Sequence, residues 1–219
     1  MGDGIFERLV SLLYPRRCII CQKLVESDIL HCGGCQCGPV DNNRLLEKLT
    51  HPLIAEIAVP FAYGKDISQA VLAMKQYRDR RMTDYYTDAA AEKLRKAYGI
   101  DGITCIPISR QALIRRGFNH SEVFARALGI KLGIPYLDGL LIRSGNIRQR
   151  NLDRGDRFVN AAAAYRLGKR ADIIKGKHIL LADDVITTGA TVLACCGCLA
   201  SAGAAAVSVA AICSTTPNA

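Results

Sequence analysis

Tryptophan is absent from this chain of 219 residues, and aromatic residues make up only 6% of it. The sequence therefore offers no evident stacking platform for a purine ring. No apolar run approaches the roughly 18 residues that a membrane-spanning helix needs, so we expect no membrane span. A Walker-type nucleotide site is also excluded, because the sequence contains no GxxxxGK[ST] motif.

The N-terminus lacks the features of a secretory signal. The stretch MGDGIFERLVSLLYP has no basic start, carries Asp3 and Glu7, and its apolar stripe ends at Pro15. We interpret that stripe as a short amphipathic helix packed on the domain surface rather than as a membrane anchor. The sequence therefore predicts a cytoplasmic protein.

Charge and cysteine content narrow the classes of partner. The formal net charge is +9, from 29 basic and 20 acidic residues. Such an excess favours anionic partners, namely phosphorylated metabolites, nucleic acid or an anionic membrane, without choosing among them. Ten cysteines without an export signal indicate metal ligation and buried thiols rather than a disulfide framework.

Two CxxC pairs, CIIC at 18–21 and CGGC at 32–35, stand ten residues apart. Each pair can form a knuckle that presents two thiolates, and four thiolates suit a closed tetrahedral Zn²⁺ site. The alternatives are free buried thiols or a redox pair, and His31 or Cys37 could replace one ligand. We predict a structural zinc site with the ligands Cys18, Cys21, Cys32 and Cys35.

Beyond this cluster the sequence alternates between strand and helix patterns. We place a domain boundary in the polar connector 41–52, which gives an N-terminal zinc module at 1–45 and a larger domain at 46–219. Strands are expected at 58–63, 103–108, 135–144, 178–183 and 205–212, and helices at 66–78, 83–98, 119–133 and 189–203. Apolar strands that alternate with helices predict an α/β fold, with a mostly parallel sheet flanked by helices.

The stretch HILLADDVITTGATV at 178–192 carries the clearest chemistry. A buried strand leads through two acids into a loop of small residues and then a helix, whose first N–H groups suit a phosphate. Hydroxyls of Thr187, Thr188 and Thr191 add donors. Because two carboxylates would repel that phosphate, they require hydroxyls, a metal or a developing carbocation beside it. A ribose 5-phosphate unit meets all of these requirements.

ILLADDVITTGAT resembles the phosphoribosyl pyrophosphate (PRPP) signature of type I phosphoribosyltransferases. With the cysteine module, Lys75 in AMKQYR, RRGFNHSE at 115–122 and QRNLDRGDRFVNA at 149–161, nearly the whole chain resembles the ComF family. That family includes ComFC and GntX-type proteins. It usually has Gln where His120 stands, and its Leu-Ser linker stretch is replaced here by Asn-Leu-Asp-Arg.

The resemblance implies a role for each matching residue. Asp183 and Asp184 would be catalytic, and Mg²⁺ would bind together with PRPP. The 5-phosphate and ribose would contact Asp183, Asp184, Thr187, Thr188, Gly189, Ala190 and Thr191. The pyrophosphate would contact Lys75, Ser109, Arg110, Arg115 and Arg116, the last two in a flexible basic loop. A further basic rim, which could also hold nucleic acid, would comprise Gln149, Arg150, Asn151, Arg154 and Arg157.

Three functions remain open at this point. The protein could be a metabolic phosphoribosyltransferase with an unidentified acceptor. It could act in DNA uptake and natural transformation, with single-stranded DNA and competence or recombination proteins as partners, which is the role that the family resemblance favours. It could also be a PRPP sensor without turnover. The intact PRPP signature supports ligand binding in all three.

Overall fold

The computed structural model describes residues 16–26, 30–35, 38–77, 80–94, 99–144 and 164–215, with the side chains of 75–77 outside the description. The predicted N-terminal helix and the basic stretch 149–161 lie outside the described residues. The helices are α2 (Asn42–Lys48), α3 (Lys65–Tyr77), α4 (Arg80–Lys93), α5 (Arg110–Arg116), α6 (His120–Leu132), η1 (Ala171–Ile174) and α8 (Ala190–Ser201). The strands are β1 (Ile54–Ala58), β2 (Phe61–Ala62), β3 (Gly102–Cys105), β4 (Leu141–Arg143), β5 (Tyr165–Leu167), β6 (His178–Ile186) and β7 (Ala206–Ser214).

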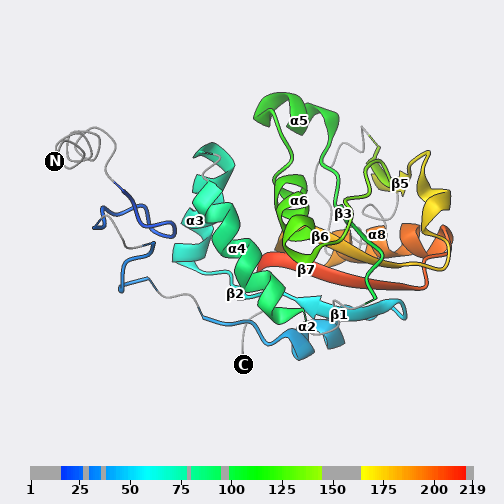
Figure 1. Ribbon diagram of the computed structural model, residues 1–219, viewed down its shortest axis with the longest axis horizontal. Coiled ribbons are helices and arrows are strands. Elements are labelled where there is room, and N and C mark those ends of the chain that lie inside the picture. The colour runs from blue at the N-terminus through cyan, green and yellow to red at the C-terminus, as the bar shows by residue number, and fades with distance from the viewer. Residues whose placement is uncertain are drawn as a thin grey trace, which may run out of the picture.

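A parallel sheet forms the centre of the molecule (Figure 1). Its strand order is β1-β7-β6-β3, and β2 also pairs with β7 in parallel. A separate two-stranded ribbon joins β4 and β5 in antiparallel register. These pairings confirm the predicted fold class.

Both faces of the sheet are covered, as the near-continuous apolar strands require. In β6, Leu180 and Ala182 pack into one core with residues of α3, α4 and α6. Their neighbours Ile179 and Leu181 face the other core, which α2 and α8 complete. Within the described part of the chain, no helix has the length and apolar character that crossing a bilayer demands.

Several element bounds differ from the sequence-based expectation. The strand expected at 58–63 is replaced by β1, which begins earlier at Ile54 and ends at Ala58, and by the short β2 at Phe61–Ala62. Pro60 lies between them, and proline has no N–H for the ladder. Strand β6 continues past Asp183 to Ile186, since β7 is long enough to supply pairing partners up to Ser214. Helix α5 and strand β5 were not predicted.

The connector predicted at 41–52 contains a helix. Asp41 caps α2, with its carboxylate accepting from the N–H groups of Asn43 at 3.0 Å and Arg44 at 3.2 Å. Leu45 is fully buried against the sheet. The domain boundary predicted near residue 45 therefore falls inside α2, and the two-domain division stays a prediction.

Candidate functional site

A small pocket of about 180 Å³ lies where β3 and β6 end. In open parallel sheets this is where ligands bind, because loops diverge beyond the carboxyl ends of the strands. The pocket draws on the β3–α5 connection, α5, α6, β4, β5, β6 and α8. Its lining residues are Ile106, Pro107, Ile108, Arg116, Asn119, His120, Ser121, Arg143, Tyr165, Asp183, Asp184 and Thr191.

The two predicted catalytic acids both line this pocket. Oδ1 of Asp183 accepts hydrogen bonds from the Ser121 hydroxyl and from the Asp184 backbone N–H, each at 2.9 Å. Burial and the neighbouring Asp184 charge raise the pKa of Asp183 to about 8, against the opposing effect of the Ser121 hydrogen bond. Asp183 therefore keeps its proton over a much wider pH range than an ordinary aspartate.

The predicted phosphate loop joins β6 to α8. Thr187 and Thr188 are exposed, and the N–H of Ala190 lies 3.4 Å from the Thr188 hydroxyl. Gly189 precedes the helix with φ of 82°, a left-handed conformation that favours glycine. Thr191, in the first turn of α8, faces the pocket. The loop thus presents hydroxyls and helix N–H groups beside the acids, as a phosphate requires.

The predicted pyrophosphate residues are distributed around α5. Arg116 lines the pocket, whereas Arg110 and Arg115 are exposed on the same helix. The Ser109 hydroxyl caps α5 by accepting from the Ala112 N–H at 3.2 Å. Lys75 lies in α3, but its side chain is outside the description.

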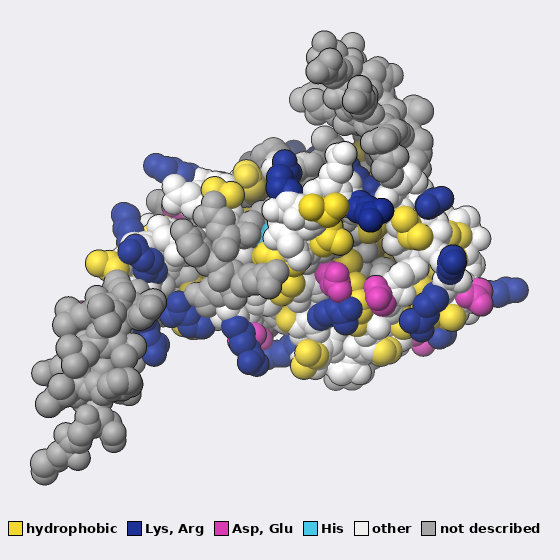
Figure 2. All heavy atoms as spheres, turned by 90° about the horizontal axis from the view of Figure 1, so that it is seen from above, with side chains coloured by type: hydrophobic (Ala, Val, Ile, Leu, Met, Phe, Trp, Pro, Cys, Tyr) yellow, Lys and Arg dark blue, Asp and Glu magenta, His cyan; other side chains and the backbone are white. Residues whose placement is uncertain are grey.

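The segment predicted as a flexible basic loop is mostly regular structure. Arg115 and Arg116 form the last turn of α5, Gly117 ends that helix with φ of 78°, and Asn119 caps α6. Helix α5 stands away from the sheet (Figure 1) and contains no buried residue. Seen from above, Lys and Arg side chains are spread over this face with scattered acidic ones between them (Figure 2).

Eight pocket residues were not among the predicted site residues, and the polar ones are Asn119, His120, Ser121, Arg143 and Tyr165. Asn119 and Ser121 belong to the RRGFNHSE motif, so the sequence did hold a signal for them. Arg143 and Tyr165 carry no such signal, because they meet only when β4 pairs with β5. Burial raises the pKa of Tyr165, while the Arg143 charge and a hydrogen bond with Thr191 oppose that rise. The β4–β5 ribbon therefore lies beside the loop that joins β6 to α8.

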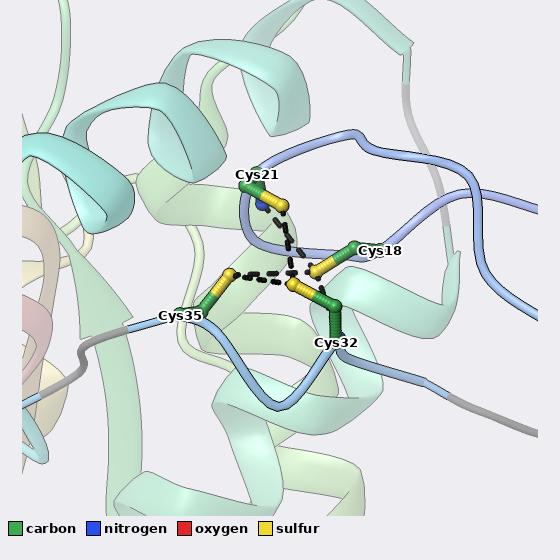
Figure 3. A group of neighbouring side chains, drawn as sticks. All are labelled: Cys18, Cys21, Cys32 and Cys35. Carbon is green, nitrogen blue, oxygen red and sulfur yellow. Dashed lines mark hydrogen bonds between the residues drawn. The ribbon is translucent and has the colours of Figure 1, made fainter.

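The four predicted zinc ligands come together. The sulfurs of Cys18, Cys21, Cys32 and Cys35 all lie within 4.8 Å of one another, and they point toward a common centre from two loops (Figure 3). Cys18 and Cys35 approach to 3.6 Å, Cys21 and Cys32 to 3.5 Å, and Cys32 and Cys35 to 3.4 Å. Tetrahedral Zn²⁺ with bonds near 2.3 Å sets sulfurs roughly 3.8 Å apart. The cluster is therefore compatible with zinc.

Backbone groups support a thiolate at Cys18. Burial raises the pKa of this thiol, but N–H groups of Cys21, Cys32 and Ile20 outweigh that effect and bring the pKa to about 6. These N–H groups lie 3.3 to 3.5 Å from the sulfur. His31 is exposed and outside the sulfur cluster, and Cys37 lies outside the described residues.

The cysteine knuckle is packed into the main core. Ile19 and Ile20, between the first two cysteines, are 1% and 2% exposed and join the core formed with α3, α4 and α6. The Tyr86 hydroxyl of α4 donates to the Ile19 carbonyl at 3.4 Å. The four-cysteine segment and the larger fold therefore share one hydrophobic core.

Comparison with curated proteins gives relatives named for DNA utilization and for competence. DNA utilization protein YhgH of Salmonella typhi is 33% identical over 116 residues, which is 52% of this chain and 50% of that protein. Competence protein F of Haemophilus influenzae is 32% identical over 92 residues, 42% of this chain and 40% of that protein. The chain thus spans about half the length, or less, of these relatives. Both relationships agree with the resemblance to the ComF family.

Solved structures overlap more loosely. Adenine phosphoribosyltransferase from Thermoanaerobacter pseudethanolicus is 16% identical, with a TM-score of 0.42 over 69% of this chain and 87% of that chain. The Leishmania tarentolae enzyme is 18% identical, with a TM-score of 0.41 over 80% of this chain and 88% of that chain. Such overlaps do not by themselves establish a fold. Residues 76–218, more than half of the chain, match the family model of the phosphoribosyl transferase domain. The chain therefore belongs to the phosphoribosyltransferase family.

Proposed function

We propose that the pocket at the ends of β3 and β6 binds PRPP together with Mg²⁺. We propose further that the protein is a cytoplasmic phosphoribosyltransferase of the ComF type that acts in DNA uptake. One observation carries the first proposal. The acid pair, the start of α8 and the guanidinium-bearing Arg116 and Arg143 all border the same small pocket.

Each part of PRPP has a chemically matched neighbour in this arrangement. The 5-phosphate fits the Thr187–Thr191 loop, where hydroxyls and helix N–H groups donate. The ribose 2- and 3-hydroxyls fit the carboxyl groups of Asp183 and Asp184, which accept hydrogen bonds. The diphosphate fits Arg116, whose planar fork suits phosphate oxygens. The predicted Lys75, Ser109, Arg110 and Arg115 would complete that end.

The chemistry is displacement of pyrophosphate from C1 of the ribose. The bond from C1 to the diphosphate oxygen breaks with its electron pair leaving on pyrophosphate, and a nucleophile of the acceptor forms the new bond to C1. The carboxyl oxygens of the acid pair carry negative or partial negative charge and would stabilise the positive character that develops on the ribose. Mg²⁺ would neutralise the diphosphate and make it a better leaving group.

Pyrophosphate release from Mg-PRPP tests this proposal. Wild-type protein, Asp184→Asn and the control Asp88→Asn, an exposed carboxylate of α4 paired with Lys131, are compared. Each is assayed alone, with nucleobases and ammonia, and with single-stranded DNA, while thermal shift follows PRPP binding. We expect PRPP to stabilise wild type and the control, and one acceptor to give release that Asp184→Asn abolishes. Binding without release would support the PRPP-sensor alternative, and no binding would refute the proposed site.

A role in DNA handling rests on a separate observation. The relatives are named for DNA utilization and competence, and the chain carries a net charge of +9. We propose that exposed Arg110 and Arg115 of α5 contact single-stranded DNA, with competence or recombination proteins as further partners. Proteins that neutralise several phosphates lose affinity steeply with salt.

Fluorescence anisotropy with a labelled oligonucleotide across salt concentrations tests that role. We expect a steep salt dependence that becomes shallower in Arg110→Glu with Arg115→Glu. The control Lys93→Glu changes an exposed basic residue at the far end of α4. Equal losses in both variants would mean that net charge, rather than α5, governs binding. Because Arg110 and Arg115 are also predicted to contact the diphosphate, weaker DNA binding on adding PRPP would mean that the two ligands compete for α5, whereas stronger binding would mean that they are coupled.

A further inference from the structure

Ser121 joins α6 to the acid pair. It stands 62 residues before Asp183 in the chain, yet its hydroxyl donates to Oδ1 of that carboxyl group at 2.9 Å. The residue is 3% exposed and borders the pocket. Because the Asp184 N–H reaches the same oxygen, two donors fix the rotation of the Asp183 carboxyl group.

Asn119 in turn fixes the position of Ser121. Its side-chain oxygen accepts from the Ser121 N–H at 3.2 Å, which caps α6. Its amide nitrogen donates to the Ile106 carbonyl at 3.0 Å and reaches the Cys105 sulfur at 3.5 Å. Both ends of this buried amide are therefore used, and they tie the start of α6 to the end of β3.

Helix α6 itself is seated closely on β3. A Cβ added at Gly129 would lie 3.0 Å from Cγ2 of Ile103 and 3.0 Å from the Ile134 carbonyl oxygen. The helix therefore approaches the strand more closely than a larger residue would allow. Ser121 is thus carried on a rigid element rather than on a loop, which is what accurate positioning of a reacting group requires.

We infer that Ser121, held by Asn119, is the positioning residue that orients the Asp183 carboxyl group toward the ribose hydroxyls of PRPP. This inference rests on the proposed function. In this reading Gly117 separates two parts of the RRGFNHSE motif. The residues before Gly117 end the exposed basic helix α5, and the residues after Gly117 hold the acid pair in position. The support acts through Asp183 and does not itself touch the reacting atoms.

The electrostatic surroundings give this role a measurable signature. Burial and Asp184 favour the neutral form of Asp183, whereas the Ser121 hydroxyl favours the charged form. Loss of the hydroxyl should therefore raise the pKa of Asp183 further. The other titratable and charged groups around it are Cys105, Arg116, His120, Arg143, Tyr165 and Cys195.

The experiment compares wild type, Ser121→Ala, Ser121→Thr and Ser201→Ala. Ser201, on α8, is exposed and donates to the Cys198 carbonyl at 2.8 Å, so its substitution removes a similar helix hydroxyl remote from the pocket. Carboxyl ¹³C NMR of the protein without PRPP follows the titration of Asp183, which is assigned by its loss in Asp183→Asn. Calorimetry measures the affinity for Mg-PRPP between pH 6 and 9.

We expect the Asp183 carboxyl group of Ser121→Ala to titrate at higher pH. We expect this variant to bind Mg-PRPP about five- to tenfold more weakly, which corresponds to the net contribution of one ordinary hydrogen bond. Ser121→Thr keeps a hydroxyl and should therefore have the wild-type pKa of Asp183 and the wild-type affinity for Mg-PRPP. Ser201→Ala should match wild type in both measurements. An Asp183 titration unchanged in Ser121→Ala overturns the inference. If wild type does not bind PRPP, the proposed function fails, while the NMR titration still decides whether Ser121 controls Asp183.

Discussion

Replacing Asp183 with Asn should remove a large part of the pH dependence of stability. The carboxyl group borders a small pocket, beside Asp184, and burial together with that neighbour raises its pKa from 3.8 to about 8. Asn has the same shape, stays neutral and keeps an oxygen that can accept from the Ser121 hydroxyl and the Asp184 N–H. The substitution therefore removes a titration without removing those two hydrogen bonds.

The direction follows from proton linkage. Between pH 4 and 8 the native protein holds the Asp183 proton and the unfolded chain has released it, so the free energy of unfolding falls as pH rises. One pKa unit corresponds to about 1.4 kcal/mol of free energy of unfolding. The change in the pKa of Asp183 from 3.8 to about 8 therefore sets an upper limit of roughly 6 kcal/mol. Asp183 remains partly exposed, and solvent screening reduces this figure. We expect a loss on the order of 2 kcal/mol between pH 6 and 8.5 in wild type.

Urea unfolding at a series of pH values between 6 and 8.5, without PRPP, measures the effect. Asp183→Asn should be more stable than wild type at the alkaline end, and the difference should shrink toward pH 6. Asp88→Asn, which changes an exposed carboxylate, should show the same dependence of the free energy of unfolding on pH as wild type. Parallel curves for wild type and Asp183→Asn across the range would refute the assignment of a raised pKa to this carboxyl group.

Other predictions test the four-cysteine cluster, the predicted phosphate loop and the pocket wall. Chelation of zinc should lower the melting temperature of the whole chain, followed by circular dichroism, because Ile19 and Ile20 lie in the main core; unchanged melting after verified metal loss would contradict this. Gly189→Ala should destabilise by about 2 kcal/mol, since it has positive φ and its Cβ would collide with Leu49. Gly197→Ala, in the exposed middle of α8, should stabilise by roughly 0.5–1 kcal/mol. If urea unfolding showed that both glycine substitutions change the free energy of unfolding in the same direction, the steric argument would be wrong.

The β4–β5 ribbon can be tested separately. Tyr165→Phe keeps the ring against Arg143, whose guanidinium carbon lies 5.6 Å from the ring centroid, but it loses the hydroxyl that bonds Thr191. We expect a several-fold loss of Mg-PRPP affinity by calorimetry with a nearly unchanged melting temperature. Equal affinity with lowered melting temperature would make Tyr165 a core residue only.

Local sequence identified the cysteine cluster and the acid–threonine stretch because each is nearly contiguous. CxxC spacing forces two thiols of one knuckle to face the same way, and ADDVITTGAT brings acids, hydroxyls and a helix start together within a few residues. The parallel α/β class followed from apolar strands that alternate with helices. Element bounds were less predictable, since the length of β6 depends on the partners that β7 offers.

The sequence by itself determined the chemical groups available, the four-cysteine cluster and the fold class, since these depend on short-range spacing and periodicity. Only the tertiary structure decided which distant residues meet. The approach of Ser121 to Asp183 across 62 positions, and the pairing of Arg143 with Tyr165 beside the phosphate loop, depend on how helices and strands pack. The packing of Ile19 and Ile20 against α4 is of the same kind. Burial set by that packing, together with the neighbouring Asp184 charge, raises the pKa of Asp183 above that of an ordinary aspartate.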